Sequence, residues 1–279
     1  MMKAMKKKDN DREAFKPLSM LYACLVYLFL YLPIIIVIVF SFNTSKINIK
    51  FEGFTAEWYL KMFDNLSLME SFQNTLIVAV VSTAVSIVIG TLCAVGLSRF
   101  EFKLKGLITN SLYIPIAIPE IVFGIALLVF FSSIEIKTGL LTLILSHVTF
   151  SMPFVAITVR SRIAGFDRSI EEAARDLGAN EFRTFMRVTL PTIMPGIIAG
   201  GMLALTLSLD DVVISFFTSG PGSTTLPLKI LGMVKRGVSP DVNALSTLVI
   251  LGTVIIMAVA NSAQSRLEKK QGGNNSKIK

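Results

Sequence analysis

Charged residues are scarce in this sequence, and their scarcity excludes most soluble folds. Only 16% of the 279 residues are Asp, Glu, Lys or Arg, whereas 53% are hydrophobic and the mean hydropathy is +0.67. A soluble domain carries about 25% charged and about 45–50% apolar residues. Because too few charges remain to cover a soluble surface, we expect an integral membrane protein.

Cysteine and histidine are nearly absent as well. The two cysteines, Cys24 and Cys93, lie in apolar runs without a metal-spaced partner, which excludes a disulfide-stapled secreted fold. The single histidine, His147, also lies in an apolar run, where it is usually a hydrogen-bonded packing residue and alternatively a proton relay. No glycine precedes a lysine, so a Walker A loop is excluded. We expect no catalytic residues, no metal site and no cofactor bound by this chain.

Six apolar stretches are long enough to cross a bilayer, which takes about 20 residues in a helix. None of them contains Lys or Arg. The stretches are 19–42, 75–97, 107–133, 139–159, 191–217 and 244–263. The first is about twice as long as the apolar region of a signal peptide, so we interpret it as an uncleaved span. The sequence therefore predicts an all-α integral membrane protein with six transmembrane helices.

The distribution of basic residues predicts the orientation. If both termini are cytoplasmic, 20 of the 27 Lys and Arg residues fall on the inner side and seven on the outer side. This asymmetry satisfies the positive-inside rule and accounts for the net charge of +8, so no nucleic-acid partner is expected. We expect a multi-pass protein of the bacterial cytoplasmic membrane, with inner tails at 1–18 and 264–279. Residues 271–279 are polar and predicted to be disordered.

The longest predicted inner loop, 160–191, carries the pattern of two short helices. A capping-box pattern begins at Ser169, Gly178 is placed for a left-handed helix end, and Asn180 can cap a second helix. Leu190-Pro191 predicts a break before the fifth span. An apolar stripe at helical spacing runs through Ile170, Ala173, Ala174 and Leu177. By this pattern alone, the loop packs either on its own bundle or on a partner.

Three carboxylates interrupt the apolar runs: Glu120, Asp210 and Asp211. Each costs about 2.5–3.5 kcal/mol at the centre of a bilayer, and no Lys or Arg of the spans can pair with them. The rise of a helix places Glu120 about 20 Å past Leu107 and Asp210 about 21 Å past Gly196, so all three carboxylates are expected at similar height in the outer part of the bilayer. Kinks expected at Pro115, Pro119 and Pro195 limit this estimate to about one turn. The functional interpretation is a pathway for a cation, with contributions from Ser208 and the outer-loop Trp58. The structural interpretation is that the carboxylates cap helix ends, Ser208 bonds to backbone and Trp58 anchors at the interface.

The loop also resembles the EAA motif of type I ABC-importer permeases. The matching residues are Glu172, Ala173, Ala174, Gly178, Leu190 and Pro191, at the spacing of that motif, with Val188 where isoleucine is usual. The resemblance implies that residues 164–191 are a coupling loop, whose short helix docks in a groove of a cytoplasmic ATPase.

Longer stretches resemble one subfamily, the C-type permease subunits of spermidine/putrescine ABC importers. These stretches are 32–35, 146–150, 207–213, 226–230 and 237–245. The resemblance implies an ABC transmembrane type-1 domain of five spans at 71–263, preceded by an extra N-terminal transmembrane helix at 19–42. It further implies a homologous B-type permease, two ATPase subunits that hold ATP and Mg, and an extracytoplasmic polyamine-binding protein as partners. The alternatives are a permease for another cationic or small solute, such as ferric iron, or a secondary transporter without an ATPase.

Overall fold

The computed structural model describes residues 2–45, 50–167, 169–234 and 239–275. Apart from one isolated bridge between Asn43 and Phe54, the regular structure in these ranges is helical. The chain divides into two units, residues 1–64 with 237–250 and residues 65–236 with 251–279. Three of the seven basic residues that are predicted on the outer side lie outside the described residues: Lys46, Lys235 and Arg236. Residues 276–279 of the tail lie outside them as well.

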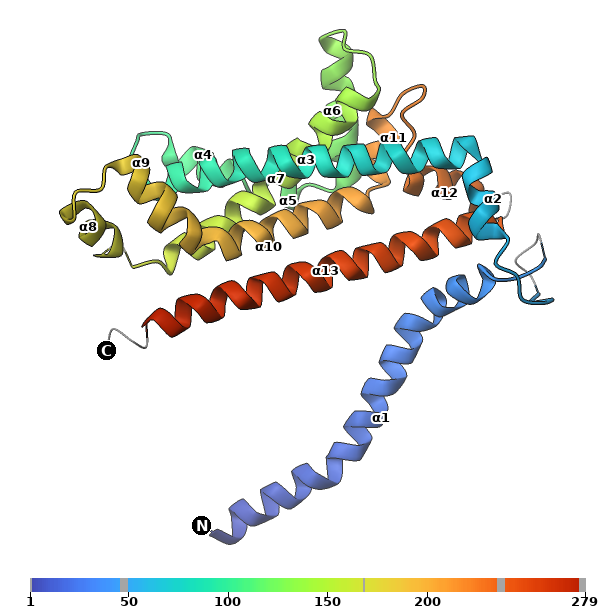
Figure 1. Cartoon of the computed structure of the whole chain (residues 1–279), viewed down its shortest axis with the longest axis horizontal. Coiled ribbons are helices and arrows are strands. Elements are labelled where there is room, and N and C mark those ends of the chain that lie inside the picture. Colours follow the sequence, from blue (N-terminus) through green and yellow to red (C-terminus); the bar gives the residue numbers. More distant parts are fainter. Residues whose placement is uncertain (1, 46–49, 168, 235–238, 276–279) are drawn as a thin grey trace. The chain divides into compact units, whose positions relative to one another are not determined.

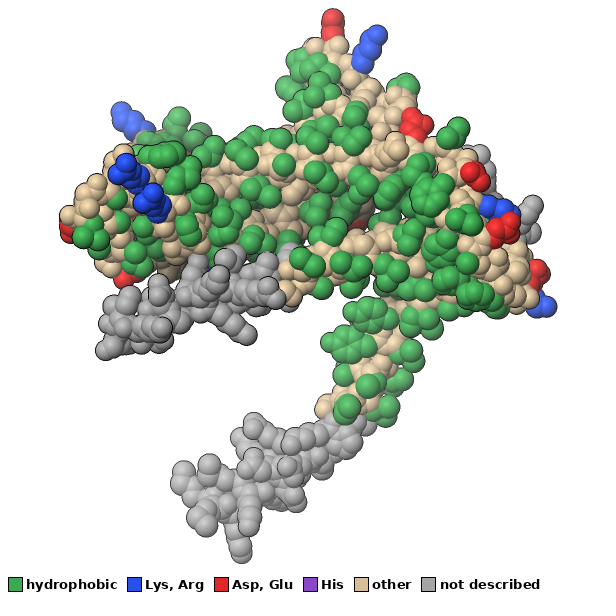
Figure 2. Space-filling model, in the orientation of Figure 1, with side chains coloured by type: hydrophobic (Ala, Val, Ile, Leu, Met, Phe, Trp, Pro, Cys, Tyr) green, Lys and Arg blue, Asp and Glu red, His purple; other side chains and the backbone are tan. Residues whose placement is uncertain are grey.

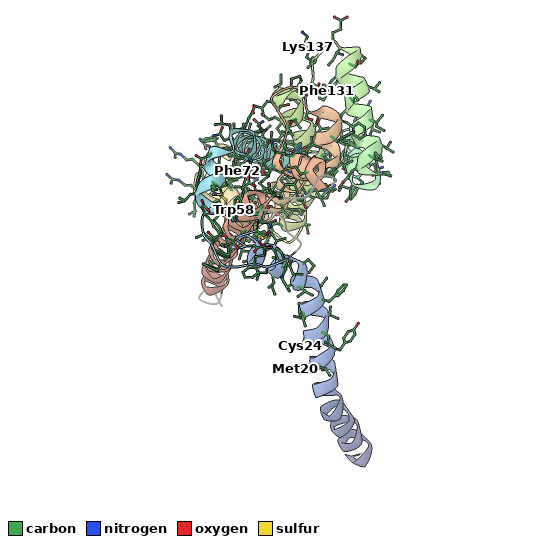
Figure 3. The ribbon with its side chains drawn as sticks, turned by 90° about the vertical axis from the view of Figure 1, so that its right-hand side faces the viewer. Met20, Cys24, Trp58, Phe72, Phe131 and Lys137 are labelled. Carbon is green, nitrogen blue, oxygen red and sulfur yellow. The ribbon has the colours of Figure 1, made fainter. Side chains whose placement is uncertain are left out.

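The first unit contains the extra N-terminal helix. It consists of α1 (Met2–Phe40), α2 (Trp58–Asp64) and the beginning of α13 (Pro240–Asn275). Most side chains of residues 19–40 of α1 are exposed, including Met20 (Figure 3), as expected for a helix that lipid surrounds. α13 continues to Asn275, so the prediction of disorder from residue 271 is wrong for its first five residues.

The core of the second unit is formed by three long helices, α3 (Leu66–Arg99), α7 (Leu140–Ala164) and α10 (Leu190–Leu209), which lie side by side (Figure 1). The buried residues between them are Ala94, Val155, Val159, Ile193, Ile197 and Ala204. Small residues allow the close approach: a Cβ on Gly90 would lie 2.8 Å from Val155 Cβ. Helix contacts within membranes favour small residues for this reason. Apolar side chains cover α3 and α10 along their length (Figure 2).

Gly90→Ala is expected to lower the stability of the folded protein. The added methyl group overlaps Val155, and overpacking of this kind costs about 1–3 kcal/mol. Gly96→Ala is the matched control on the same helix, because its Cβ would meet nothing within 4 Å and alanine improves helix propensity by up to about 1 kcal/mol. The measurement is the thermal midpoint of the detergent-solubilised protein. Equal midpoints for the two variants would contradict the prediction.

The third predicted span is bent rather than straight. It consists of α4 (Lys105–Ser111), α5 (Ile114–Ala117) and α6 (Glu120–Ser133), and the segment Lys105–Ala117 meets α6 at 111°. The bend falls at Ile118, whose backbone is extended because proline follows it. The depth that a straight helix predicts for Glu120 is therefore wrong.

The predicted break at Leu190-Pro191 is also wrong. α9 (Glu181–Thr184), the π-helical turn η1 (Phe185–Thr189) and α10 form one continuous apolar helix over Glu181–Leu209. A π turn shifts the hydrogen bonds to i−5, as in Leu190 N–H to Phe185 O, and it accommodates Pro191, which has no N–H to donate. At the other end, this helix stops at Leu209 instead of Phe217.

Five helices of the described chain are long and apolar enough to cross a membrane, or six if the bent pair counts as one span. The five segments are Ser19–Phe40, Leu66–Arg99, Leu140–Ala164, Glu181–Leu209 and Pro240–Val259. The loop between the last two carries α12 (Leu226–Val234), whose first N–H donates to Thr75 Oγ1 of α3 at 2.7 Å. The architecture agrees with the predicted all-α membrane fold.

Candidate functional site

The Asp pair lies in the break between α10 and α11 (Val213–Thr218). The Asp211 carboxylate accepts the backbone N–H groups of Ile214, at 3.2 Å, and Ser215, at 2.7 Å. These are free N–H groups at the start of a helix, and a carboxylate is a favourable acceptor for them. Asp211 therefore caps α11, as the structural interpretation predicts.

His147 of α7 faces the same carboxylate. Its Nε2 lies 3.4 Å from Asp211 Oδ2, and the two side chains are only 2% and 5% exposed. Nε2 also lies 3.2 Å from Ser215 Oγ, and Nδ1 lies 2.7 Å from Ser208 Oγ. Because a carboxylate only accepts hydrogen bonds, we place the ring hydrogen on Nε2, so that Nδ1 accepts from Ser208. The buried, hydrogen-bonded position of His147 agrees with the packing interpretation, and the proton relay stays an alternative. In the described part of the chain, no Lys or Arg of the spans pairs with Asp211, as expected, but a histidine does.

Hydroxyl groups extend this arrangement to α3. Ser208 Oγ lies 3.2 Å from Ser82 Oγ, so Ser208 bonds to side chains rather than only to backbone. A second pair, Ser86 and Ser151, joins α3 to α7 at 2.9 Å. We call Ser82, His147, Ser208, Asp211 and Ser215 the membrane polar cluster. In a surrounding of low dielectric, such bonds are strong and hold the three core helices in one arrangement.

Asp210 differs from its neighbour. Its backbone ends α10 and its side chain is exposed. Glu120 is likewise exposed, as the first residue of α6, where a carboxylate complements the helix N-terminus. Within the described residues, neither side chain hydrogen-bonds to the membrane polar cluster. Of the Asp pair, Asp210 therefore has the exposed carboxylate and Asp211 the buried one.

Trp58 belongs to the first unit, where it begins α2. Its indole Nε1 donates to Asn43 O at 2.6 Å, and the Lys61 ammonium lies 5.1 Å from its ring centroid. The ring thus already has a cation–π partner within its own chain.

The predicted loop 160–191 forms a helical hairpin. Its predicted helix ends at Gly178 and Asn180 are confirmed, whereas the capping box predicted at Ser169 is not, because Ser169 is the first residue of the helix and not its cap. α8 (Ser169–Asp176) begins where Asp167 Oδ1 accepts the Ser169 N–H at 3.0 Å, a bond that also lowers the pKa of the Asp167 carboxyl. Gly178 has a φ of +85°, the left-handed conformation expected of it. Asn180 caps α9 by accepting the Arg183 N–H at 2.8 Å.

The apolar stripe of α8 faces away from the chain's own bundle. Leu177 is 90% exposed, Ile170 and Ala173 are exposed, and so is the motif residue Glu172, whereas Ala174 is half-buried. Phe182 and Met186 add exposed apolar surface on the second helix of the hairpin. In Figure 2, apolar side chains lie together with Lys and Arg at the end of the unit that α8 and α9 form. The stripe is thus available to a partner.

Three residues that the sequence analysis did not single out join the hairpin to the bundle: Arg99, Glu171 and Thr189. Arg99 Nη2 donates to Glu171 Oε1 and, at 2.8 Å, to Thr189 Oγ1, which itself donates to Glu171. The one sequence feature that points to Glu171 is its spacing of four residues from Arg175, which is typical of an ion pair within a helix. In the structure, Arg175 Nη2 lies 3.8 Å from Glu171 Oε2. Leu190 follows this contact and packs on the core of the bundle, whereas Pro191 is exposed.

Known proteins share this fold and much of this sequence. The family described as "Binding-protein-dependent transport system inner membrane component" matches residues 86–272. The spermidine/putrescine transport system permease protein PotC of Escherichia coli strain K12 is 45% identical over 254 residues, which are 91% of this chain and 95% of that protein. The putrescine transport system permease protein PotI of the same strain is 37% identical over 262 residues, covering 91% and 93%.

One solved structure shows the same fold at low sequence identity. It is a bacterial alginate ABC transporter in complex with a pentasaccharide-bound periplasmic protein. A chain of that transporter matches with a TM-score of 0.68 at 18% identity, covering 93% of this chain and 97% of that chain. The predicted permease fold and the resemblance are confirmed.

Proposed function

Because the chain belongs to the family of binding-protein-dependent transport system inner membrane components, we propose that it is a permease subunit of an ATP-driven importer for polyamines. The observation that carries this substrate class is the 45% identity over 91% of the chain to a spermidine/putrescine permease. The protein is a multi-pass protein of the inner membrane. The excess of basic residues on one side supports cytoplasmic termini.

The geometry at the α10–α11 break supports a cationic solute. A polyamine is a flexible chain of ammonium groups, each of which donates hydrogen bonds to anionic acceptors. Asp210 offers an exposed carboxylate where a span is interrupted. Asp211 and Ser208 stabilise this break through their buried hydrogen bonds to Ser215 and His147. In this proposal Asp210 contacts the solute directly, Glu120 adds a second exposed carboxylate, and Trp58 contributes near the outer loop.

The hairpin supports coupling to a separate ATPase. Its exposed apolar stripe, with Glu172 and Ala173, is the surface that we propose docks on the ATPase. Gly178 shapes the turn, and Leu190 and Pro191 lead into α10. ATP and Mg then bind to the ATPase partner rather than to this chain. The other proposed partners are a second, homologous permease, a second ATPase subunit and an extracytoplasmic binding protein.

Reconstitution tests the proposal. We expect vesicles that contain this chain with its partner permease, ATPase and binding protein to take up spermidine or putrescine only with ATP, and vanadate to block the uptake. If the vesicles take up another cation, such as ferric iron, and no polyamine, that cation is the solute and the polyamine proposal is wrong. Uptake by the isolated chain down a gradient would instead identify a transporter that needs no ATPase.

Gly178→Val is expected to uncouple ATP hydrolysis from transport. A side chain at a φ of +85° costs about 1–2 kcal/mol, so the turn of the hairpin changes and the stripe is misplaced. We expect insertion into the membrane to be normal and uptake to fall several-fold, measured in the vesicles described above. Gly165→Ala is the control, because its φ is −90° and its Cβ would make only ordinary contact. Wild-type uptake by Gly178→Val would contradict the prediction.

A further inference from the structure

The cytoplasmic hairpin is attached to its own bundle in an unusual way. Among the described residues of α8, Glu171 is the one that is buried, with 8% of its surface exposed, and it is charged. Its neighbours in sequence, Ile170 and Glu172, are exposed. Apolar burial therefore does not hold α8 on the bundle, and a polar contact must do so.

That contact joins three elements. Arg99 is the last residue of α3, Glu171 lies in α8, and Thr189 ends the π turn that continues into α10. Their side chains close a triangle of hydrogen bonds, in which one Arg99 nitrogen serves both other residues. In Figure 1 the hairpin lies at the end of the bundle where α3 ends and the helix of α10 begins.

Further contacts orient the guanidinium group of Arg99. It lies 5.8 Å from the centroid of the Phe185 ring and 3.9 Å from Glu181 Oε2. The side chains of Arg99 and Glu171 are only 22% and 11% exposed, so water screens their attraction little. A guanidinium held between several acceptors resists rotation better than a surface ion pair does.

From this geometry we infer that Arg99, Glu171 and Thr189 form a rigid joint, which carries the displacement of α8 to α3 and α10 in each transport cycle. The inference rests on the proposed function, because α8 must be displaced by an ATPase. Two packed helices that are tied to one short helix move with it as a body, as in other two-state helical assemblies. These are positioning residues: they touch neither ATP nor the solute.

The test measures coupling in vesicles that contain the whole transporter. With Glu171→Gln or Arg99→Gln, we expect the spermidine transported per ATP hydrolysed to fall about tenfold, an ordinary size for coupling between two sites, while the ATPase still co-purifies. Glu101→Gln, which changes an exposed carboxylate just after the end of α3 and outside the hairpin, is the control and should leave the ratio unchanged.

A second readout needs no transported solute. In a chain with Cys24 and Cys93 replaced by serine, Asp210→Cys should change its reactivity toward an impermeant maleimide when ATP binds to the complex, and Glu171→Gln should abolish that change. A persisting change, or a wild-type transport ratio in Glu171→Gln, would overturn the joint. A wild-type complex that takes up no spermidine would overturn the proposed solute instead, and the maleimide readout would still decide the joint.

Discussion

Asp211→Ala is expected to lower the free energy of unfolding by about 3 kcal/mol, because each buried donor left without its acceptor costs about 1–3 kcal/mol. The carboxylate serves three donors: the N–H groups of Ile214 and Ser215 and the ring of His147. Without it, the start of α11 and the α7 histidine are left without an acceptor in a buried place. The measurement is the thermal midpoint and the yield of monodisperse protein in detergent.

The neighbouring carboxylate is the control for stability. Asp210→Ala removes the same charge from an exposed side chain, so its effect on stability should stay within about 0.5 kcal/mol. Asp211→Asn should be intermediate, since its amide oxygen still accepts a backbone N–H. His147→Ala combined with Asp211→Ala should cost less than the sum of the two single variants, because both remove the same contact. If Asp211→Ala had the same thermal midpoint as Asp210→Ala, the capping role would be refuted.

Asp210→Asn is expected to lower polyamine uptake about tenfold at low solute concentration, the effect of losing about 1.4 kcal/mol of binding. The exposed carboxylate is the acceptor that the proposed pathway offers to an ammonium group, and a charge-assisted hydrogen bond contributes about 1.5–3 kcal/mol. The loss should be larger for spermidine than for putrescine, because spermidine carries more ammonium groups. Initial rates in vesicles with the complete transporter measure it.

At position 210, the effect of the carboxylate charge on uptake has to be separated from the effect of side-chain shape. Asp210→Glu keeps the carboxylate and should retain most of the uptake, and assembly with the ATPase should be equal in both variants. From the sequence, Asp211→Asn is also expected to reduce uptake without preventing assembly. Wild-type uptake in Asp210→Asn, in Asp211→Asn and in the double variant would exclude a role for the pair in the pathway.

Local signals predicted the hairpin well. Gly178 and Asn180 end and begin helices through their own backbone and side chain, so their roles follow from residues a few positions away. The same is true of the apolar lengths of the spans. The structure departs from these signals at prolines: the kink expected at Pro119 is a bend of 111°, and the break expected at Pro191 is absent. Proline is compatible with a sharp bend or with a helix start, according to what packs around it.

The contacts of the site were beyond such local signals. Arg99 and Glu171 are 72 positions apart in the chain, and His147 and Ser208 are 61 apart. The partner of Asp211 is a histidine, whereas only lysine and arginine were considered as partners within the spans. Glu171 directly precedes the motif that begins at Glu172, and the motif itself does not include it.

The sequence by itself determined a membrane-spanning helical protein with a hairpin between two spans, because apolar length and helix ends depend on neighbouring residues; its identification as a permease rests on the resemblance of the hairpin and of longer stretches to that family. Only the tertiary structure decided which carboxylate of each adjacent pair is buried: Asp211 rather than Asp210, and Glu171 rather than Glu172. Consecutive helical residues point about 100° apart, and in the break after α10 the capping of α11 turns Asp211 inward. Which direction is covered depends on α3, α7 and α10 packing together, and no local pattern specifies that packing.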